Sequence, residues 1–174
     1  GACRQVRASD EQLDEWFNAF RILQFREVWN ELGEWVCKAK PTLGPGVGER
    51  LRAARDISDQ DVASARACRQ TAIEFVAAIF EHSHVLVLPT VPGPAPLRES
   101  SIEQMEAYRR TAMRLLCVAG LAGVPQISLP LLAVDGLPFG LSLIGPRGSD
   151  RWLLSVAARL TRAAGQNAGA ASST

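Results

Sequence analysis

The stretch Ala119-Gly-Leu-Ala-Gly-Val-Pro-Gln-Ile-Ser-Leu-Pro130 (AGLAGVPQISLP) decides how the second half of this chain folds. It contains two glycines and two prolines but no acid, base or thiol. Glycine often ends a helix because it tolerates the left-handed backbone found there. We therefore expect its glycines to end a helix, Gly123-Val-Pro125 to form a turn, and Ile127 to Leu129 to enter a sheet.

Apolar spacing and chain-breaking residues predict the elements on both sides of this stretch. Serine N-caps at Ser9, Ser58 and Ser101 mark three helix starts, and Asp61 follows Ser58 as in a capping box. Asp135-Gly136 is typical of a turn between two strands. The expected helices are residues 9–40, 49–55, 58–83, 101–119 and 149–160, and the expected strands are residues 84–88, 126–132 and 139–144.

These elements predict an α/β fold with a mixed sheet flanked by helices. The three strands are mostly apolar, which is typical of strands buried on both faces. Such strands need neighbours and covering helices, so we expect an incomplete sheet that joins a larger sheet or another chain. Residues 1–164 are predicted to form this α/β unit, and the small polar residues of 165–174 are predicted to form a disordered tail.

The composition indicates one globular domain and argues against several classes of partner. The 174 residues include 19 basic and 18 acidic side chains, which gives a net charge of +1. This balance favours neither nucleic acid nor a membrane as a partner, and no apolar run has the length of a membrane span. The four cysteines are scattered without a CxxC pair, so we expect no metal, no cofactor and a cytoplasmic location.

Residues that commonly carry catalysis are expected to be structural here. His82 and His84 flank a helix-to-strand turn without clustered metal ligands, so a solvated or capping role is favoured over a catalytic one. Ser142 lies in a GxSxxG stretch inside an apolar strand, whereas a nucleophile elbow needs a strained strand-to-helix turn. Ser128 has the same strand context. The sequence therefore does not by itself assemble a nucleophile, a base and an oxyanion hole.

Three motifs in fixed order nevertheless resemble a known family. They are VLVLPTVPGPAP at residues 85–96, AGLAGVPQISLP at 119–130, and DGLPFGLSLIGPRGSD at 135–150. Together they resemble the C-terminal part of the amidase signature family, whose members hydrolyse amide C–N bonds. The wording is most similar to bacterial amidases of the biuret hydrolase and indole-acetamide hydrolase branches.

The resemblance implies that this chain contains no catalytic residue. The family's Ser–cis-Ser–Lys triad and its Gly/Ser-rich loop lie upstream of the matched motifs. Neither Lys38 nor Lys40, the only lysines, lies in the required motif. The implied partners are a small-molecule amide substrate, in the complete enzyme, and either the missing N-terminal amidase portion or a second copy of the chain.

By position in these motifs, the chain would supply sheet and one wall of the substrate pocket. Family members that act on amidated amino acids carry a carboxylate in the helix before the glycine turn, where this chain has Met113, Leu115 and Leu116. An amino-acid amide is therefore disfavoured as substrate. The candidate substrate-binding residues are Thr90, Val91, Pro92, Gly123, Val124, Pro125, Gln126 and, more weakly supported, Arg50.

Three hypotheses follow from these observations. The first is the C-terminal fragment of an amidase whose serine nucleophile lies upstream, so that the isolated chain is inactive. The second is a non-catalytic amidase-like module that serves as a binding or scaffold unit. The third is a small independent α/β domain that shares the motifs without sharing the enzyme.

Overall fold

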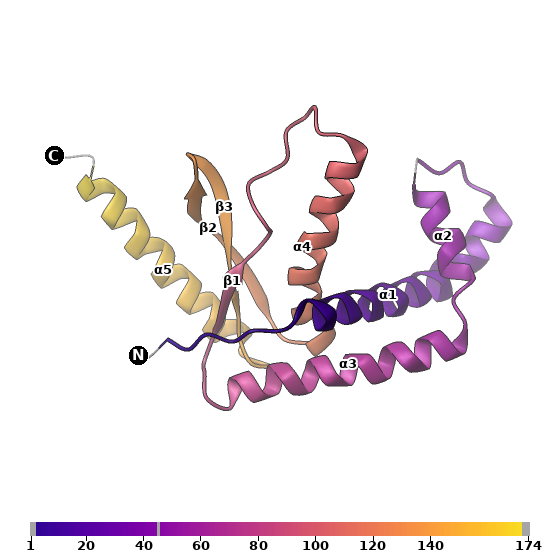
Figure 1. Ribbon diagram of the computed structural model, residues 1–174, viewed down its shortest axis with the longest axis horizontal. Coiled ribbons are helices and arrows are strands. Elements are labelled where there is room, and N and C mark those ends of the chain that lie inside the picture. Colours follow the sequence, from indigo (N-terminus) through magenta and orange to yellow (C-terminus); the bar gives the residue numbers. More distant parts are fainter. Residues whose placement is uncertain (1–2, 45, 172–174) are drawn as a thin grey trace.

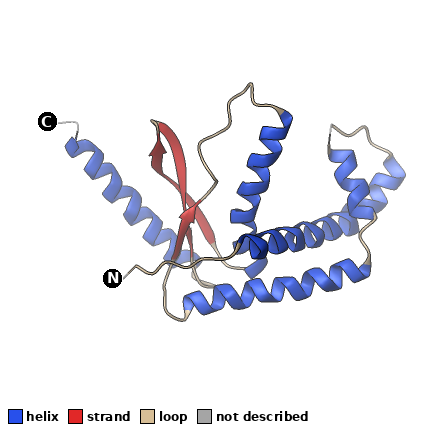
Figure 2. Ribbon diagram, in the orientation of Figure 1, coloured by secondary structure: helices blue, strands red, loops and turns tan. Residues whose placement is uncertain are grey.

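The computed structural model describes residues 3–44 and 46–171 of the chain. Four helices, α1 to α4, form one side of the molecule, and a small sheet with the fifth helix forms the other (Figure 1). The sheet lies between α4 and α5, and α1 and α3 run alongside each other below it (Figure 2). The helices are α1 (Asp10–Ala39), α2 (Val47–Arg55), α3 (Asp59–Phe80), α4 (Ile102–Ala122) and α5 (Asp150–Ala171); the strands are β1 (Leu86–Pro89), β2 (Gln126–Val134) and β3 (Leu137–Ile144).

Three helices begin at the serine N-caps that the sequence predicts. The side chains of Ser9, Ser58 and Ser101 each accept a hydrogen bond from the backbone N–H three residues later. The side chain at that third position accepts in return from the N-cap backbone, so all three are complete capping boxes. Each box satisfies two of the backbone N–H groups that a helix start otherwise leaves unpaired, which explains why these boundaries are sharp.

The helical half is held together by one apolar cluster. Trp16 of α1 is buried against Ala72 and Val76 of α3 and against Cys117 and Leu121 of α4. The Trp16 indole N–H donates to Thr71 Oγ1 at 3.1 Å, so the buried ring also has its polar atom satisfied.

The sheet has the strand order β1-β3-β2, and both pairings are antiparallel. The expected mixture of parallel and antiparallel pairs is therefore absent from the strands that the structure describes. The turn between β2 and β3 is Asp135-Gly136, as predicted, and both residues have the positive φ that such a two-residue hairpin turn requires.

The expectation of an incomplete sheet is confirmed, because the strands of this chain are not covered on both faces. Val87 of β1 and Leu137 of β3 are about half exposed, at 50% and 51%. Among the helices that the structure describes, α5 makes the close contacts with the sheet, and it covers one face. The apolar composition of a strand indicates that it needs cover, but it does not show which chain provides that cover.

Helix α5 is longer than the sequence pattern indicates. It runs from Asp150 to Ala171, beyond Leu160 and through residues 165–171 of the expected disordered tail. Alanine has the highest helix propensity, so the alanines among these small residues favour a helix. The expectation of disorder rested on the small size and polarity of the residues and not on this propensity. Residues 172–174 lie outside the described part of the chain.

Candidate functional site

Four polar side chains from β2, β3 and the loop after β1 form a continuous hydrogen-bonded cluster. The Gln126 Nε2 group donates to Ser142 Oγ at 2.8 Å. Ser142 Oγ lies 2.9 Å from Thr90 Oγ1, and Thr90 Oγ1 lies 2.7 Å from Ser128 Oγ. Ser142 has no exposed surface, whereas Ser128 at the other end is exposed. We call Thr90, Gln126, Ser128 and Ser142 the polar cluster.

Strand register brings these residues together. Ser128 of β2 pairs directly with Ser142 of β3, so the two side chains stand on the same face of the sheet. Thr90 follows β1, and its backbone N–H donates to the Gly140 carbonyl oxygen at 2.9 Å. That bond extends the β1–β3 ladder by one residue and places the threonine hydroxyl between the two serines.

Gly140 leaves the space that the cluster occupies. A Cβ atom at this position would lie 2.7 Å from Thr90 Oγ1 and 2.9 Å from Ser128 Oγ. Real side chains do not make contacts that close, so any residue larger than glycine would displace one of the hydroxyls. The first glycine of the GLSLIG stretch is therefore required because of the neighbouring Thr90 and Ser128 hydroxyls, and not because of an unusual backbone conformation.

The predicted glycine turn after α4 is confirmed, with one change. Gly120 lies within α4, and Gly123 alone ends the helix, with φ 65° and ψ 40°. The N–H groups of Gly123 and Val124 both bond to the Ala119 carbonyl oxygen. The Pro125 carbonyl oxygen then accepts from Gly145 N–H at 3.0 Å, which fixes the entry of β2 beside the end of β3.

The proline-rich loop after β1 is tied to the helical half. Tyr108 of α4 donates its hydroxyl to the Gly93 carbonyl oxygen at 3.0 Å. Val91 is half-buried and Pro92 is exposed within this loop. The two residues follow Thr90 directly, and they are not among the residues that form the polar cluster.

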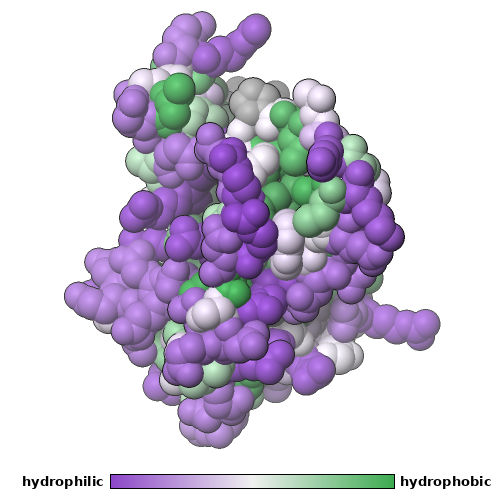
Figure 3. Space-filling model, turned by 90° about the vertical axis from the view of Figure 1, so that its right-hand side faces the viewer, coloured by the Kyte–Doolittle hydropathy of each residue, from purple (hydrophilic) through white to green (hydrophobic). Residues whose placement is uncertain are grey.

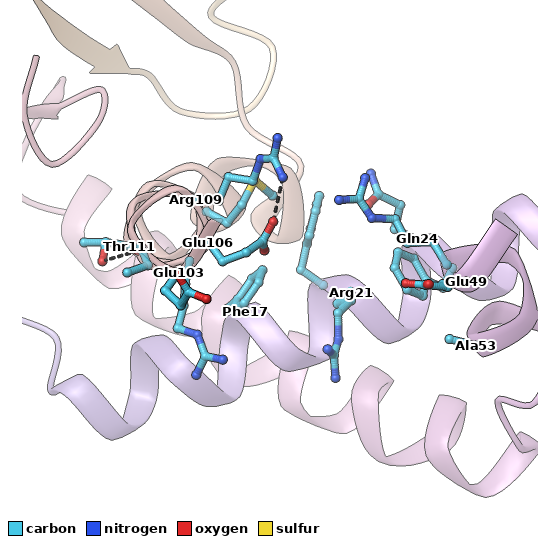
Figure 4. A pocket seen from close by; sticks show the side chains of 15 residues that line it. Phe17, Arg21, Gln24, Glu49, Ala53, Glu103, Glu106, Arg109 and Thr111 are labelled. Carbon is cyan, nitrogen blue, oxygen red and sulfur yellow. Dashed lines mark hydrogen bonds and ion pairs between the residues drawn. The ribbon is translucent and has the colours of Figure 1, made fainter. Parts of the chain in front are cut away.

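Arg50 lies apart from the other predicted site residues, in a groove of about 1060 Å³ lined by α1, α2 and α4. Figure 4 shows that charged side chains of α4 and α2 flank this groove, with Phe17 of α1 between them. An ion pair of 2.7 Å joins Glu106 and Arg109 on its α4 side. Arg50 therefore lines a second hollow and is not part of the polar cluster.

Of the four thiols, the two that are at least partly buried have a raised pKa, and the two imidazoles are exposed. Burial raises the pKa of the Cys117 thiol to about 12, and burial is also the main cause that raises the pKa of Cys68. Both thiols are therefore poor sources of thiolate. His82 and His84 are exposed, as expected for solvated residues. Within residues 3–44 and 46–171 no three metal-ligating side chains are grouped together.

Sequence reasoning identified Thr90 and Gln126 but treated Ser128 and Ser142 as ordinary strand residues. The missing information is the register, because only pairing places Ser128 opposite Ser142. One signal was available: Gln126, Ser128, Gly140 and Ser142 alternate with apolar residues along their strands. That alternation predicts one polar face.

Known proteins resemble this chain in sequence and in fold. The Amidase family model matches residues 33–154, and the chain belongs to this family. It is 36% identical to Amidase 1 of Arabidopsis thaliana over 139 residues, which cover 80% of this chain and 33% of that protein. A crystal structure of an amidase superposes with a TM-score of 0.74 at 25% identity, over 86% of this chain and 36% of that one. The chain thus spans about a third of the length of these relatives.

A further relative corrects the expected location. The chain is 31% identical to the translocon at the outer membrane of chloroplasts 64 of Pisum sativum, over 79% of this chain and 23% of that protein. The expectation of a cytoplasmic location is therefore wrong. It rested on the scattered cysteines, which indicate a reducing environment but do not distinguish the cytoplasm from other reducing locations. Of the helices that the structure describes, none combines the length and apolar character needed to cross a membrane.

Proposed function

We propose that this chain forms one wall of the substrate site of an amide-hydrolysing enzyme, with the serine nucleophile supplied by polypeptide outside these 174 residues. The observation that carries the proposal is the polar cluster, because it joins Thr90 of one family motif to Gln126 of another. The cluster is partly buried, and hydrogen bonds that satisfy one another in this way hold its outermost group in a defined place.

In the proposed reaction, a serine oxygen attacks the amide carbon and the amine leaves, forming an acyl-enzyme that water then hydrolyses. Backbone amides outside this chain would stabilise the oxyanion. This chain's part is to hold the acyl side of the substrate in line with the attacking oxygen. Fixed orientation of that kind can contribute several kcal/mol to lowering the barrier.

The exposed apolar surface of the chain supports a site completed by further polypeptide. Leu97, which precedes α4, and Ile102, at the start of α4, are 74% and 78% exposed. Apolar surface also lies between hydrophilic side chains on the face drawn in Figure 3. Both outer strands, β1 and β2, present an unpaired edge within the described sheet. Exposed edges and apolar patches together favour either a longer sheet or self-association.

A chimera tests the proposal. Residues 33–154 of this chain would replace the matching third of Arabidopsis Amidase 1, and turnover of acetanilide would be measured for the chimera and for the 174-residue chain alone. We expect turnover by the chimera and none by the chain. Turnover by the chain alone, or a folded chimera without activity, contradicts the proposal.

The finer assignments remain proposals of the same kind. Val91, Pro92 and the turn Gly123-Val-Pro125 are proposed to border the substrate cavity, with Arg50 as a weaker candidate because it lines a separate groove. The biuret and indole-acetamide branches are distinguished by turnover of biuret against indole-3-acetamide in the active chimera. A preference for an amino-acid amide over both would contradict the substrate class inferred from the apolar helix before the turn.

A second candidate is a non-catalytic amidase-like module. The observation that favours it is the 31% identity to the pea chloroplast translocon protein, whose name describes no hydrolysis. A chain adapted only for binding would give a chimera that folds but does not turn over acetanilide. The chimera experiment therefore separates the two candidates.

A further inference from the structure

We infer that the Ser128 hydroxyl is a hydrogen-bond donor held for the carbonyl oxygen of a neutral amide ligand, and that Gln126, Ser142 and Thr90 set the direction in which it donates. The ligand class rests on the proposed function. The direction of donation rests on the contacts of the polar cluster alone.

The direction is set at Ser142. Its side chain has no exposed surface, so its hydroxyl proton must be donated within the protein. Ser142 Oγ already accepts from Gln126 Nε2, which has protons and no lone pair to offer. The remaining partner given by the structure is Thr90 Oγ1 at 2.9 Å. Ser142 therefore donates to Thr90.

The same reasoning gives the direction of the next hydrogen bond, between Thr90 and Ser128. A hydroxyl has one proton to donate and two lone pairs to accept with, so Thr90 can accept from Ser142 while its own proton still needs an acceptor, and Ser128 Oγ is the remaining partner that the structure gives for it. Thr90 therefore donates its own proton to Ser128 Oγ, 2.7 Å away. The proton of Ser128 is then directed away from the cluster, at the end of the network that is exposed. Because each bond polarises the next, this last hydroxyl is a better donor than an isolated serine.

This arrangement fits a binding group and argues against a nucleophile. A nucleophilic serine needs a base that takes its proton and an oxygen that is free to attack. The side-chain partner that the structure gives for Ser128 is instead the Thr90 hydroxyl, which is neutral and not a base. Ser128 is thus assigned to ligand binding.

The chemistry of the cluster selects the ligand. All four side chains are neutral, and the exposed end of the cluster is the Ser128 hydroxyl. A single oriented neutral donor suits the oxygen of an amide, whereas a carboxylate ligand would favour a cationic partner such as arginine. The structure therefore assigns the Ser128 end of the cluster to an uncharged acyl group.

The test is binding of acetanilide to the isotope-labelled 174-residue chain, followed by chemical-shift titration. N-ethylaniline is the matched probe, because it has the same carbon–nitrogen skeleton without the carbonyl oxygen. We expect Ser128→Ala to weaken acetanilide binding on the order of 2- to 10-fold, the effect of one hydrogen bond, with N-ethylaniline unchanged. Ser128→Thr, which keeps the hydroxyl, should restore acetanilide binding. Ser155→Ala, at an exposed serine of α5, is the control substitution.

A second variant tests the direction of donation. Glu in place of Gln126 has no N–H to donate, so its carboxylate would accept from Ser142 and reverse every bond of the cluster. Ser128 would then donate to Thr90 and present only a lone pair. We expect Gln126→Glu to weaken acetanilide binding about as much as Ser128→Ala does, although Ser128 is intact.

Two outcomes overturn the inference: equal acetanilide binding by the wild-type chain and Ser128→Ala, or equal binding of acetanilide and N-ethylaniline by the wild-type chain. The proposed function fails differently. If the chimera is inactive but Ser128→Ala still weakens acetanilide binding, only the proposed hydrolysis is contradicted. If the chimera is active and Ser128→Ala does not change its KM for acetanilide, only the assignment of Ser128 as a ligand donor is contradicted.

Discussion

The two faces of the small sheet are built from alternate residues of the same strands, yet they are organised differently. On one face, Leu129 and Leu143 are buried against Leu153 and Ala157 of α5. On the other face, Ser128 and its neighbours form the polar cluster. Because successive side chains of a strand point to opposite faces, a single step along β3 crosses from one organisation to the other.

The two faces are expected to lose stability differently when one of their side chains is substituted. Apolar contacts are non-directional and roughly proportional to buried area, so the α5 face can lose a group and keep the rest. Each bond of the polar cluster depends on the direction of the bond before it. Removal of one hydroxyl therefore leaves partners unsatisfied on both sides, and the polar face responds as a unit.

The largest effect is expected on the apolar face. Leu153 is 2% exposed and lies in the cluster between α5 and the sheet. Leu153→Ala would remove its methyl groups and leave a cavity, with an expected loss of about 3–5 kcal/mol in the free energy of unfolding. Urea denaturation monitored by circular dichroism measures this loss.

Its neighbour provides the control. Leu154 is 58% exposed on the same helix, so Leu154→Ala should change the free energy of unfolding by less than about 0.5 kcal/mol. Similar losses for both leucines would mean that α5 does not cover the sheet as the structure shows.

A smaller but still clear loss is expected from the centre of the polar cluster. Ser142→Ala removes the acceptor of Gln126 Nε2 and the donor to Thr90 Oγ1. We expect a loss of about 1–3 kcal/mol in the free energy of unfolding, because the partly buried Gln126 amide loses its acceptor and Thr90 loses its donor. The double variant with Gln126→Leu should recover part of this loss. A double variant less stable than the sum of both single changes would contradict the assignment of the bond.

Gly140 tests the cluster without removing a polar atom. Gly140→Ala places a Cβ atom against Thr90 Oγ1 and Ser128 Oγ, and we expect a destabilisation of about 1–2 kcal/mol in thermal unfolding. Gly93→Ala is the matched control, because a Cβ atom added at Gly93 would meet no other atom within 4 Å. Equal melting temperatures for both variants would show that the polar face tolerates expansion and is not closely packed.

The sequence predicts the elements of this fold well because their signals are local. Serine caps such as Ser58 satisfy N–H groups within one turn, and Gly123 supplies the left-handed residue that ends α4. The Asp135-Gly136 turn likewise depends on two neighbouring residues. Each signal acts over four residues or fewer, so no knowledge of the rest of the chain is needed.

The candidate site is predicted less well because it depends on distant pairs. Thr90 and Ser142 are 52 positions apart and meet only through the β1–β3 register. Motif position placed Arg50 with the pocket wall, whereas the structure puts it in the groove between helices. Register and helix packing are set by the whole chain, and a motif does not encode either one.

The smallest expected effect is a difference between the sheet and the helical core in how their stability depends on pH. None of the polar-cluster side chains changes its charge between pH 8 and 9.5, whereas the buried Cys117 of the helical cluster has a pKa raised from 9.0 to about 12. A raised pKa means that the folded state holds the thiol proton more tightly. Stability from this group is therefore complete below the unfolded pKa near 9 and falls as the pH rises from there toward 12.

We expect a loss on the order of 1 kcal/mol in the free energy of unfolding between pH 8 and 9.5, measured by urea denaturation at each pH. Cys117→Ala lowers stability at both pH values but should remove this thiol's share of the pH dependence. Ser142→Ala should lower stability and leave the pH dependence unchanged, because its partners are neutral. A pH dependence altered by Ser142→Ala and not by Cys117→Ala would break the distinction between the uncharged polar face and the titrating helical core.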